Sequence, residues 1–411
     1  MPASKPNILL LTTNLGLGGA QRVVRDHAAA LSRSFAVEQA VFNRDGGDFY
    51  GDQRDFLSLD VPGGGTPIHK LVHFVQRVLR ARALKRRLKV GVCISHLEGA
   101  DYINLLSRTG EKTILCIHGS KLADANISGP AGWLRKAVLI PWLYNRADAI
   151  VTVSRDIVPE LEALGVRRPE VVTINNFFDL DAIARAADEP LLPDEEALFA
   201  ARPMLVTAGR LAIQKNQAPL LDVLAAVKAQ CPAGLMLLGD GELRDALATR
   251  ARALGLKVCE ADRGEPLGGD HDVWLMGSRT NPFKYLRRAS LFLLPSGWEG
   301  FPMALCEAMA CGLVAVASDC PTGPREILAP DSQGTGTIRS AEWAPYGVLA
   351  PIMDAANVQQ TGLAAWRDAI VRLLDDPPLR AALAEAASRR VEDFRPEPIV
   401  NQWVALIERL C

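Results

Sequence analysis

Two carboxylates lie close together in a segment that has the marks of an anion-binding site. Glu299 comes directly before Gly300, and Glu307 follows within the same run, 296–312. We expect a helix to begin at about Pro302, because a proline in the first turn loses no hydrogen bond, and to end at Gly312. The free N–H groups of such a helix start bind anions, and carboxylates accept hydrogen bonds from hydroxyl groups. The segment therefore predicts a site for a ligand that carries both phosphates and hydroxyls, such as a nucleotide-sugar.

The elements that must position this segment belong to a strand-and-helix pattern that occurs twice. Strands are expected at 7–13, 37–42, 90–95, 113–117, 149–153 and 170–174, and again at 204–208, 234–238, 291–295 and 313–317, with helices between them. Apolar strands that alternate with helices indicate parallel sheets with crossover helices. The predicted fold class is therefore α/β, with two facing Rossmann-like domains and a ligand site in the cleft between them.

The length of 411 residues exceeds a usual single core, which also favours two domains. We place an N-terminal Rossmann-like domain at 1–185, a linker with clustered prolines and acidic residues at 186–202, and a C-terminal Rossmann-like domain at 203–395. The last segment, 396–411, predicts a helix with a loose apolar face that needs a partner surface. A return of this helix to the N-terminal domain is one solution.

The composition indicates the cellular compartment of the protein and excludes one class of partner. A hydrophobic content of 49% and a charged content of 23% are ordinary for a globular protein. No apolar run approaches about 18 residues and no signal peptide is visible, so we expect a cytoplasmic protein. The eight cysteines form no C-x-x-C pair or Cys/His ligand spacing, which predicts core thiols in a reducing compartment. The basic residues lack an aromatic platform, so we expect no nucleic-acid partner.

The segment 70–89 interleaves basic and apolar residues, as a basic amphipathic helix does. One interpretation is peripheral attachment to an anionic membrane surface on the inner face of the membrane, where lipid-linked acceptors reside. The other is an ordinary helix that packs its apolar stripe on the sheet. The apolar run 133–144 also allows two interpretations: it packs in the core, or it contacts an acceptor lipid. The basic residues of the first segment are Lys70, Arg77, Arg80, Arg82, Lys85, Arg86, Arg87 and Lys89.

Several short motifs, taken in order, resemble glycosyltransferase family 4, a large retaining family with the two-domain GT-B fold. Its members transfer sugars from nucleotide donors. The resemblance covers essentially the whole chain, and although each motif is weak alone, their order and spacing are specific. The motifs are Gly18-Gly19, His118-Gly119, Val153-Ser154, Gly209-Arg210 with Gln214-Lys215-Asn216, Gly239-Asp240-Gly241, and E-G-F-P-x-x-x-x-E from Glu299 to Glu307.

The resemblance assigns the donor-binding roles in the second domain. Arg210 and Lys215 are similar to the cationic pair on the donor diphosphate. Glu299 is similar to the carboxylate on the donor-sugar hydroxyls, and Glu307 to the ribose ligand. The backbone that the resemblance places against the phosphates and the sugar is that of Gly300, Phe301, Pro302, Met303, Ala304 and Leu305.

Three further roles follow from the resemblance. In the first domain, Gly18 and Gly19 resemble the loop that closes on the donor diphosphate, and His118 resembles the active-site histidine near the transferred sugar. In the second, Arg279 lies where the family approaches the nucleotide base, although a solvated arginine explains it equally well. The first domain is then expected to bind the acceptor and the second to bind the donor.

The chemistry of the reaction agrees with these roles. Breaking a sugar–diphosphate bond builds negative charge on the leaving group, which Arg210, Lys215 and the helix start at Pro302 would stabilise. The nearest D-x-D run, at 179–181, falls where the first domain ends, so we expect no metal and no cofactor, with the nucleotide-sugar as a substrate. The resemblance implies retention of the anomeric configuration, and no side-chain nucleophile is named.

The predicted function is transfer of a hexose-type sugar from a nucleotide-diphosphate donor, expected to be UDP-linked, to a glycan or lipid-linked glycan. The run 319–328 resembles family members that build surface polysaccharides and glycoconjugates. The alternatives are a nucleotide-sugar epimerase or phosphorylase on the same fold, or a non-catalytic relative that binds sugar nucleotides. A nicotinamide-dependent dehydrogenase is disfavoured, because Gln21 occupies the third glycine position of its fingerprint.

Overall fold

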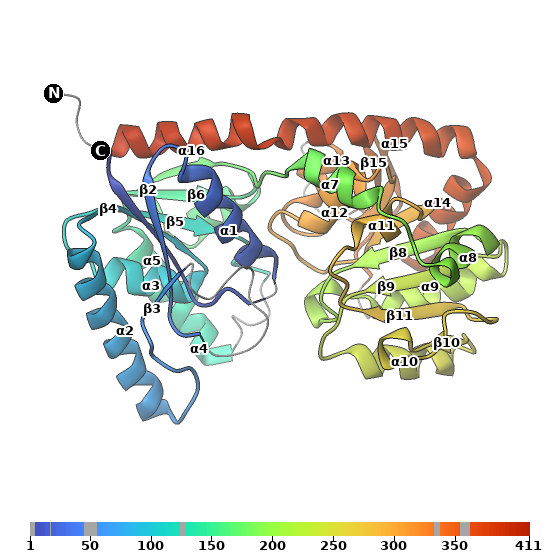
Figure 1. The fold of residues 1–411 in the computed structure, drawn as a ribbon, viewed down its shortest axis with the longest axis horizontal. Coiled ribbons are helices and arrows are strands. Elements are labelled where there is room, and N and C mark those ends of the chain that lie inside the picture. The colour runs from blue at the N-terminus through green and yellow to red at the C-terminus, as the bar shows by residue number, and fades with distance from the viewer. Residues whose placement is uncertain (1–4, 17, 45–55, 124–128, 333–337, 354–361) are drawn as a thin grey trace. The chain divides into compact units, whose positions relative to one another are not determined.

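The structure is a computed structural model that describes residues 5–16, 18–44, 56–123, 129–332, 338–353 and 362–411. The chain divides into two compact units, one formed by Met1–Phe177 with Pro396–Cys411 and the other by Phe178–Arg395. Each unit contains a sheet with helices packed on it (Figure 1). The predicted α/β class with two Rossmann-like domains is confirmed.

The first unit has, within its described residues, a seven-stranded parallel sheet with the order β3-β2-β1-β4-β5-β6-β7. The direction of strand addition reverses between β1 and β4, and in doubly wound sheets ligands bind beyond the carboxyl ends of the strands at such a reversal. The two-residue strand β3 was not predicted, since so short a segment carries no pattern. The strands are β1 (Asn7–Thr12), β2 (Ala36–Val41), β3 (Leu57–Ser58), β4 (Val90–His96), β5 (Lys112–Ile117), β6 (Ala149–Thr152) and β7 (Glu170–Thr173).

The helices of the first unit include the last helix of the chain, α16 (Pro396–Leu410), which packs against α1 (Gly19–Leu31). Trp403 of α16 is buried, and its ring lies 4.9 Å from the ring of His27 in α1. The apolar face of the C-terminal helix is thus covered within the first unit. The other helices are α2 (Pro67–Arg87), α3 (Glu98–Leu106), α4 (Gly129–Leu134), the π-helical η2 (Arg135–Leu139), α5 (Ile140–Tyr144) and α6 (Ile157–Ala163).

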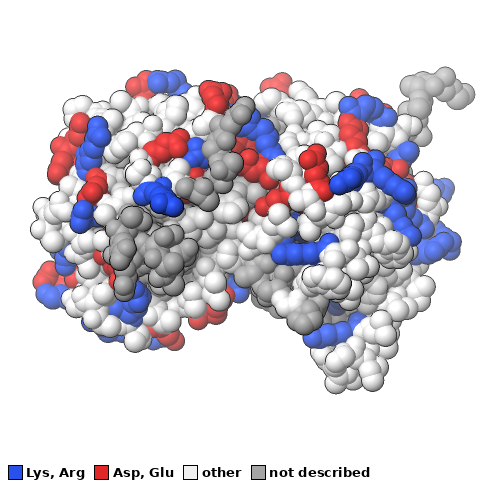
Figure 2. Space-filling view, turned by 180° about the vertical axis from the view of Figure 1, so that it is seen from behind, with Lys and Arg blue, Asp and Glu red and all other residues white. Residues whose placement is uncertain are grey.

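Helix α2 has two apolar faces. Phe74, Val78, Ala81 and Leu84 pack on the core of the first unit. Nearer the start of the helix, five large apolar side chains are exposed, and this part of the helix forms a largely uncharged projection at the lower right of Figure 2. The exposed residues, spaced three or four positions apart as one helical face requires, are Ile68, Leu71, Val72, Val75 and Leu79.

The second unit has, within its described residues, an eight-stranded sheet with the order β10-β11-β9-β8-β12-β13-β15-β14. Its pairs are parallel apart from the antiparallel pair β14–β15. Here the reversal lies between β8 and β12. The strands are β8 (Met204–Ala208), β9 (Gly234–Leu238), β10 (Val258–Cys259), β11 (Val273–Gly277), β12 (Leu291–Leu294), β13 (Ala315–Ser318), β14 (Glu342–Ala344) and β15 (Gly347–Ala350).

The segment 186–202, which the sequence analysis interprets as a linker, is folded into the second unit. Helix α8 (Pro193–Ala201) begins in it, with Pro193 as its first residue. The buried Glu195 carboxylate accepts from the backbone N–H of Leu192 at 2.9 Å and from Lys284 Nζ at 3.1 Å. The prolines and acidic residues of this segment therefore mark a helix start, where both residue types are favourable, and the boundary between the units lies earlier, at 177/178.

The remaining helices of the second unit cover its sheet and lead to its loops. They are α7 (Leu180–Ala187), η3 (Ile213–Lys215), α9 (Ala218–Lys228), α10 (Arg244–Ala253), η4 (Ala261–Arg263), α11 (Phe283–Leu286), α12 (Met303–Ala310), α13 (Pro324–Leu328), α14 (Leu363–Asp375), α15 (Pro377–Val391) and η6 (Glu392–Phe394).

Candidate active site

The loops that follow β8 and β12 lie side by side at the reversal of the second sheet, because these two strands are paired. The backbone N–H of Gly297 donates to the Gln214 carbonyl at 2.9 Å, and Gln214 Nε2 donates to the Trp298 carbonyl at 3.0 Å. Asn216 adopts a left-handed φ of 50° and donates through Nδ2 to the Pro295 carbonyl at 3.2 Å. These bonds join two segments that are about 80 residues apart in the sequence into one wall.

Lys215 and Glu299 form an ion pair on this wall. Lys215 Nζ lies 2.6 Å from Glu299 Oε1, and Ser296 Oγ donates to the same oxygen at 2.6 Å. Glu299 is only 4% exposed and Ser296 is fully buried, whereas the Lys215 side chain remains 23% exposed. A carboxylate held by a cation and a hydroxyl is fixed in place, and the partly exposed lysine remains accessible to an anionic ligand.

Arg210 lies outside this pair and has a different partner. Its Nη2 contacts Glu242 Oε2 at 2.9 Å, and its side chain is 72% exposed. An exposed ion pair contributes little to stability, so a ligand can displace Glu242 at small cost. Glu242 could not be predicted as a partner of Arg210, because an isolated acidic residue in a loop carries no chemical signal.

Helix α12 starts beside Glu299, and its N-cap is Pro302, so the helix begins one residue later than predicted. The Phe301 side chain is buried, with its ring 5.1 Å from that of Phe394. The N–H groups of Met303 and Ala304 lie in the first turn, where intrahelical acceptors are lacking. Gly300 precedes this helix start, and the buried Leu305 is the third residue of the helix.

Two further candidates lie elsewhere in the second unit. Glu307 is the fifth residue of α12 and is buried. Arg279 follows β11 and is half-buried, and its Nε has no hydrogen-bond partner in the part of the chain that the structure describes. A buried donor without a partner is costly, which favours a role in binding over the solvated alternative.

The loops after β8 and β9 touch through two glycines. Gly239 has a φ of +140°, and a Cβ at this position would lie 2.1 Å from the Gly209 carbonyl oxygen. We expect Gly239→Ala to destabilise the second unit by about 3 kcal/mol or more, because both the φ and the contact are forbidden to alanine. Urea denaturation measures the effect.

Gly255→Ala is the matched control: Gly255 also has a positive φ, but a Cβ there meets no atom within 4 Å. Equal losses in the two variants would contradict the close-contact explanation.

In the first unit, Gly18 and Gly19 follow β1 at the sheet reversal. Gly18 is the N-cap of α1 with extended backbone, and its carbonyl accepts the N–H of Arg22 at 3.0 Å. Gly19 is the first residue of the helix. The two glycines thus place a helix start at the position that the topology favours for ligands.

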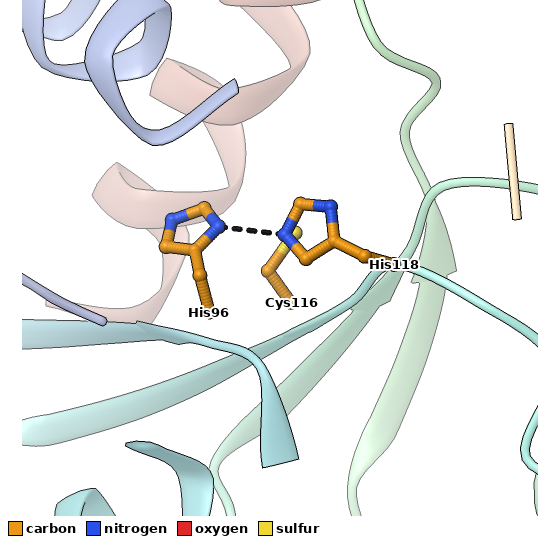
Figure 3. Close-up of side chains that lie close together, drawn as sticks. All are labelled: His96, Cys116 and His118. Atoms are coloured by element: carbon orange, nitrogen blue, oxygen red, sulfur yellow. Dashed lines mark hydrogen bonds between the residues drawn. The ribbon is translucent and has the colours of Figure 1, made fainter. Parts of the chain in front are cut away.

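His118 follows β5 and contacts a second histidine, His96, at the end of β4. His118 Nε2 lies 2.8 Å from His96 Nδ1, and the Cys116 thiol is beside them (Figure 3). Burial, with a smaller effect of the Lys121 charge, lowers the pKa of His118 to about 4. Burial also lowers the pKa of His96 well below its usual value. Both rings are therefore neutral at neutral pH, and one donates to the other.

His96 was not predicted from the sequence. The prediction of a core thiol is confirmed for Cys116, which is fully buried, but the spacing of cysteines along the chain did not reveal that this thiol lies beside two histidines. The ligand atoms of His96, Cys116 and His118 all lie within 4.8 Å of one another. A signal was available, since both predicted strands, 90–95 and 113–117, are followed by a histidine, and neighbouring parallel strands end at the same edge. Cys116 shares a face of β5 with His118, two residues later.

The sequence-predicted residues thus fall into two groups. Lys215, Glu299 and the start of α12 come together in the second unit, which also holds Arg210, Arg279 and Glu307. The first unit holds Gly18, Gly19 and His118.

Comparison with protein-family models gives two matches that together span most of the chain. The model described as "Glycosyl transferase 4-like domain" matches residues 18–176, and the one described as "Glycosyl transferases group 1" matches residues 202–376. These two ranges correspond to the two units found in the structure.

Curated proteins and solved structures give a consistent result. An uncharacterized glycosyltransferase of Methanocaldococcus jannaschii is 25% identical over 357 residues, 81% of this chain and 83% of the relative. The Campylobacter jejuni N-acetylgalactosamine-N,N'-diacetylbacillosaminyl-diphospho-undecaprenol 4-alpha-N-acetylgalactosaminyltransferase is 27% identical, with 93% of each chain covered. The structure of Anabaena HepE in complex with UDP and glucose superposes with a TM-score of 0.71 at 18% identity, covering 98% of this chain and 100% of HepE.

Proposed function

We propose that this chain, which belongs to the family 4-type glycosyltransferases with the GT-B fold, transfers a hexose-type sugar from a UDP-linked donor to a glycan or lipid-linked glycan. The transfer retains the anomeric configuration and requires no metal ion. His118 contacts the transferred sugar, and Gly18 and Gly19 approach the diphosphate.

The observation that carries the proposal is the Lys215–Glu299 pair beside the start of α12. Lys215 and the first-turn N–H groups of α12 offer positive charge to a diphosphate leaving group, which gains negative charge as the sugar departs. The buried Glu299 carboxylate accepts hydrogen bonds from sugar hydroxyls. Arg210 adds a second cation once it leaves Glu242, and Glu307 and Arg279 bind the ribose and the base.

The names of the similar proteins support the choice of donor and acceptor. HepE binds UDP and glucose, and the Campylobacter relative is named for a diphospho-undecaprenol acceptor, a lipid-linked glycan. We therefore prefer a UDP-sugar and a lipid-linked acceptor over the other combinations.

A donor screen tests this proposal. At a concentration a hundred times its Kd, a donor that binds only the folded state stabilises it by about 2.7 kcal/mol. For a unit of this size we expect a rise in Tm of about 5 to 10 °C with the matching UDP-hexose. GDP- and ADP-sugars should give smaller shifts, and a larger shift with either of them would contradict the UDP preference.

The products distinguish the transferase from its alternatives. A transferase releases UDP and extends the glycan, with the anomeric configuration of the donor visible in the NMR spectrum of the new linkage. A phosphorylase would instead require inorganic phosphate and release a sugar phosphate, and an epimerase would return a changed nucleotide-sugar. A relative without catalytic activity would bind the donor and release no UDP with any acceptor.

We further propose that the first unit binds an anionic membrane surface through α2, where a lipid-linked acceptor would be met. The exposed apolar face of α2 is followed along the same face by Arg82 and Arg86, which are also exposed. Apolar side chains next to arginines are the features that bind an anionic lipid surface. None of the described helices is long and apolar enough to cross a bilayer.

The run 133–144 adds exposed apolar surface to the same unit. Trp133, Leu134, Val138 and Trp142 are exposed, whereas Ile140 and Leu143 are buried. One face of this run thus packs in the core, and its other face is exposed to solvent. Interfacial tryptophans support contact with lipid.

Liposome sedimentation tests the membrane proposal. We expect the chain to sediment with vesicles that contain anionic lipid, and Leu71→Ser/Leu79→Ser or Arg82→Gln/Arg86→Gln to lower the bound fraction severalfold, because each pair lies on the exposed face. Arg250→Gln, an exposed arginine of the second unit, is the control. If neither double variant lowers the bound fraction relative to the control, the membrane proposal is contradicted. Lys85, which the sequence analysis grouped with the surface cations, is buried and does not belong in this test.

A further inference from the structure

The histidines and the cysteine at the carboxyl ends of β4 and β5 have the geometry of a metal-binding set. Their ligand atoms lie within 4.8 Å of one another, and the two ring nitrogens are 2.8 Å apart. Figure 3 shows the rings meeting at these nitrogens with the thiol next to them. In a tetrahedral zinc site, nitrogen and sulfur ligand atoms lie about 3.3 to 3.6 Å apart, so side-chain shifts of about 1 Å would close the set around an ion.

The chemistry of the three groups selects a particular class of cation. Two imidazoles and one thiolate prefer Zn²⁺ and other soft or borderline transition metals, and they are poor ligands for Mg²⁺ and Ca²⁺. Because burial keeps both imidazoles neutral at neutral pH, their lone pairs do not have to be freed from protons. Burial also raises the pKa of the Cys116 thiol, so the ion must displace its proton. The S–H bond breaks, the S–Zn bond forms, and the proton leaves to solvent.

Three ionisable groups outside the set act on it. Asp101 in α3 acts electrostatically on Cys116, but burial raises the pKa of Asp101 to about 7, so it offers a bound cation only a partial negative charge at neutral pH. Lys121 acts on His118 with the opposite sign, but its Nζ lies 3.4 Å from Glu98 Oε2, which offsets its charge. His27, whose ring lies against that of His96, is buried and neutral, since burial, with a smaller effect of His118, lowers the pKa of His27 to about 3.

A second observation points to a ligand at this place. Nε2 of His96 and both ring nitrogens of His27 are buried without a hydrogen-bond partner in the described ranges. The two rings are 5.5 Å apart, centroid to centroid. A metal-bound histidine usually donates its other N–H to a neighbouring acceptor, and the His27 ring, whose nitrogens also lack a partner, is the neighbouring group. Binding of an ion through Nδ1 of His96 would therefore fix the proton on Nε2, the nitrogen that is unpaired beside the His27 ring.

We propose that His96, Cys116 and His118 bind one Zn²⁺ ion and that the bound ion inhibits sugar transfer. The inhibitory part rests on the proposed function, in which His118 contacts the transferred sugar. A His118 nitrogen that coordinates zinc is no longer available to the sugar, and the ion adds positive charge where the reaction develops positive charge on the sugar. The bound ion thus has a regulatory role and takes no part in the chemistry.

Direct metal binding tests the site without reference to activity. Equilibrium dialysis of the full chain should show one tightly bound Zn²⁺, and Co²⁺ should give a thiolate-to-cobalt charge-transfer band. Cys116→Ala should remove the band and weaken Zn²⁺ binding by more than about a hundredfold, since outer-shell changes alone cost about 10- to 100-fold. Cys93→Ala, which removes a buried thiol from β4 in the same sheet, should leave both unchanged. All variants carry Cys411→Ser, which removes the exposed thiol.

The proposed site would be overturned if the charge-transfer band and the Zn²⁺ affinity were the same with and without Cys116. If Cys116→Ala fails to fold, as judged by circular dichroism, His96→Ala tests the same ligand set. Activity measurements test the inhibitory role. Zn²⁺ should inhibit sugar transfer by the protein with Cys116 and by Cys93→Ala, and a chelator should restore the activity. Sugar transfer by Cys116→Ala should not be inhibited by Zn²⁺. Equal inhibition of Cys116→Ala would overturn the inhibitory role. Absence of transfer in every metal-free sample would contradict the proposed function, while the binding data would still decide the site.

Discussion

Glu299→Gln is expected to lower the rate of sugar transfer by about a hundredfold to a thousandfold, the usual effect of losing one preorganised charge at a reacting centre. The substitution keeps the shape of the side chain but removes the charge that Lys215 contacts at 2.6 Å. Lys215 then loses its orientation, and the sugar hydroxyls lose their strongest acceptor. Single-turnover transfer with saturating donor measures the rate, and calorimetry measures donor binding separately.

Lys215→Met tests the other half of the pair. We expect weaker donor binding together with a slower rate, because the lysine would contact the diphosphate in both the bound and the transition state. If the two residues act as a unit, the double variant should be little worse than the poorer single variant. Arg250→Gln, whose ion pair with Asp222 lies elsewhere in the second unit, serves as the control. Near-normal turnover in both single variants would refute the site assignment.

The candidate catalytic loops could be located from the sequence because they follow apolar strands. Lys215 comes shortly after the run 204–208 and Glu299 shortly after 291–295, so a parallel sheet places both at carboxyl ends of strands. That β8 and β12 are neighbours could not be derived, since strand order depends on packing of the whole unit. The ion pair itself depends on the hydrogen bonds of Gln214, Asn216 and Gly297, which no local pattern encodes.

The errors of the sequence analysis also have physical causes. Pro193 and its acidic neighbours were interpreted as a linker, but the same residues favour a helix start, and the choice is decided by the tertiary partners of Glu195. The cysteines were judged by their spacing along the chain, whereas His96 and Cys116 meet across two strands. Lys85 looked like its basic neighbours because a periodic pattern of charge does not reveal which cation has a buried partner.

The position of Lys85 leads to the second large effect. Its Nζ lies 2.7 Å from Glu111 Oε1 and also donates to the carbonyl and the side-chain oxygen of Asn104, at 2.8 and 2.7 Å. All three donors of the ammonium are therefore used, and both side chains of the ion pair are fully buried. We expect Lys85→Met to destabilise the protein by about 3 to 5 kcal/mol, because it leaves the Glu111 carboxylate buried without its cation. Urea denaturation measures the loss, and Arg86→Met, the exposed neighbour in α2, should change stability by less than about 0.5 kcal/mol.

The pH dependence separates an unpaired charge from simple loss of packing. Burial by itself would raise the pKa of the Glu111 carboxyl, but Lys85 and the hydrogen bonds from Thr109 hold it below its usual value. The pair therefore stabilises the protein above the ordinary pKa of glutamate, and this contribution is lost as the pH falls toward the folded-state pKa. In Lys85→Met burial dominates, the folded-state pKa rises, and the deficit should shrink at acid pH. The double variant Lys85→Met/Glu111→Leu should recover much of the stability at neutral pH. A deficit that is constant with pH, and that the second substitution does not reduce, would show that the lysine contributes through packing alone.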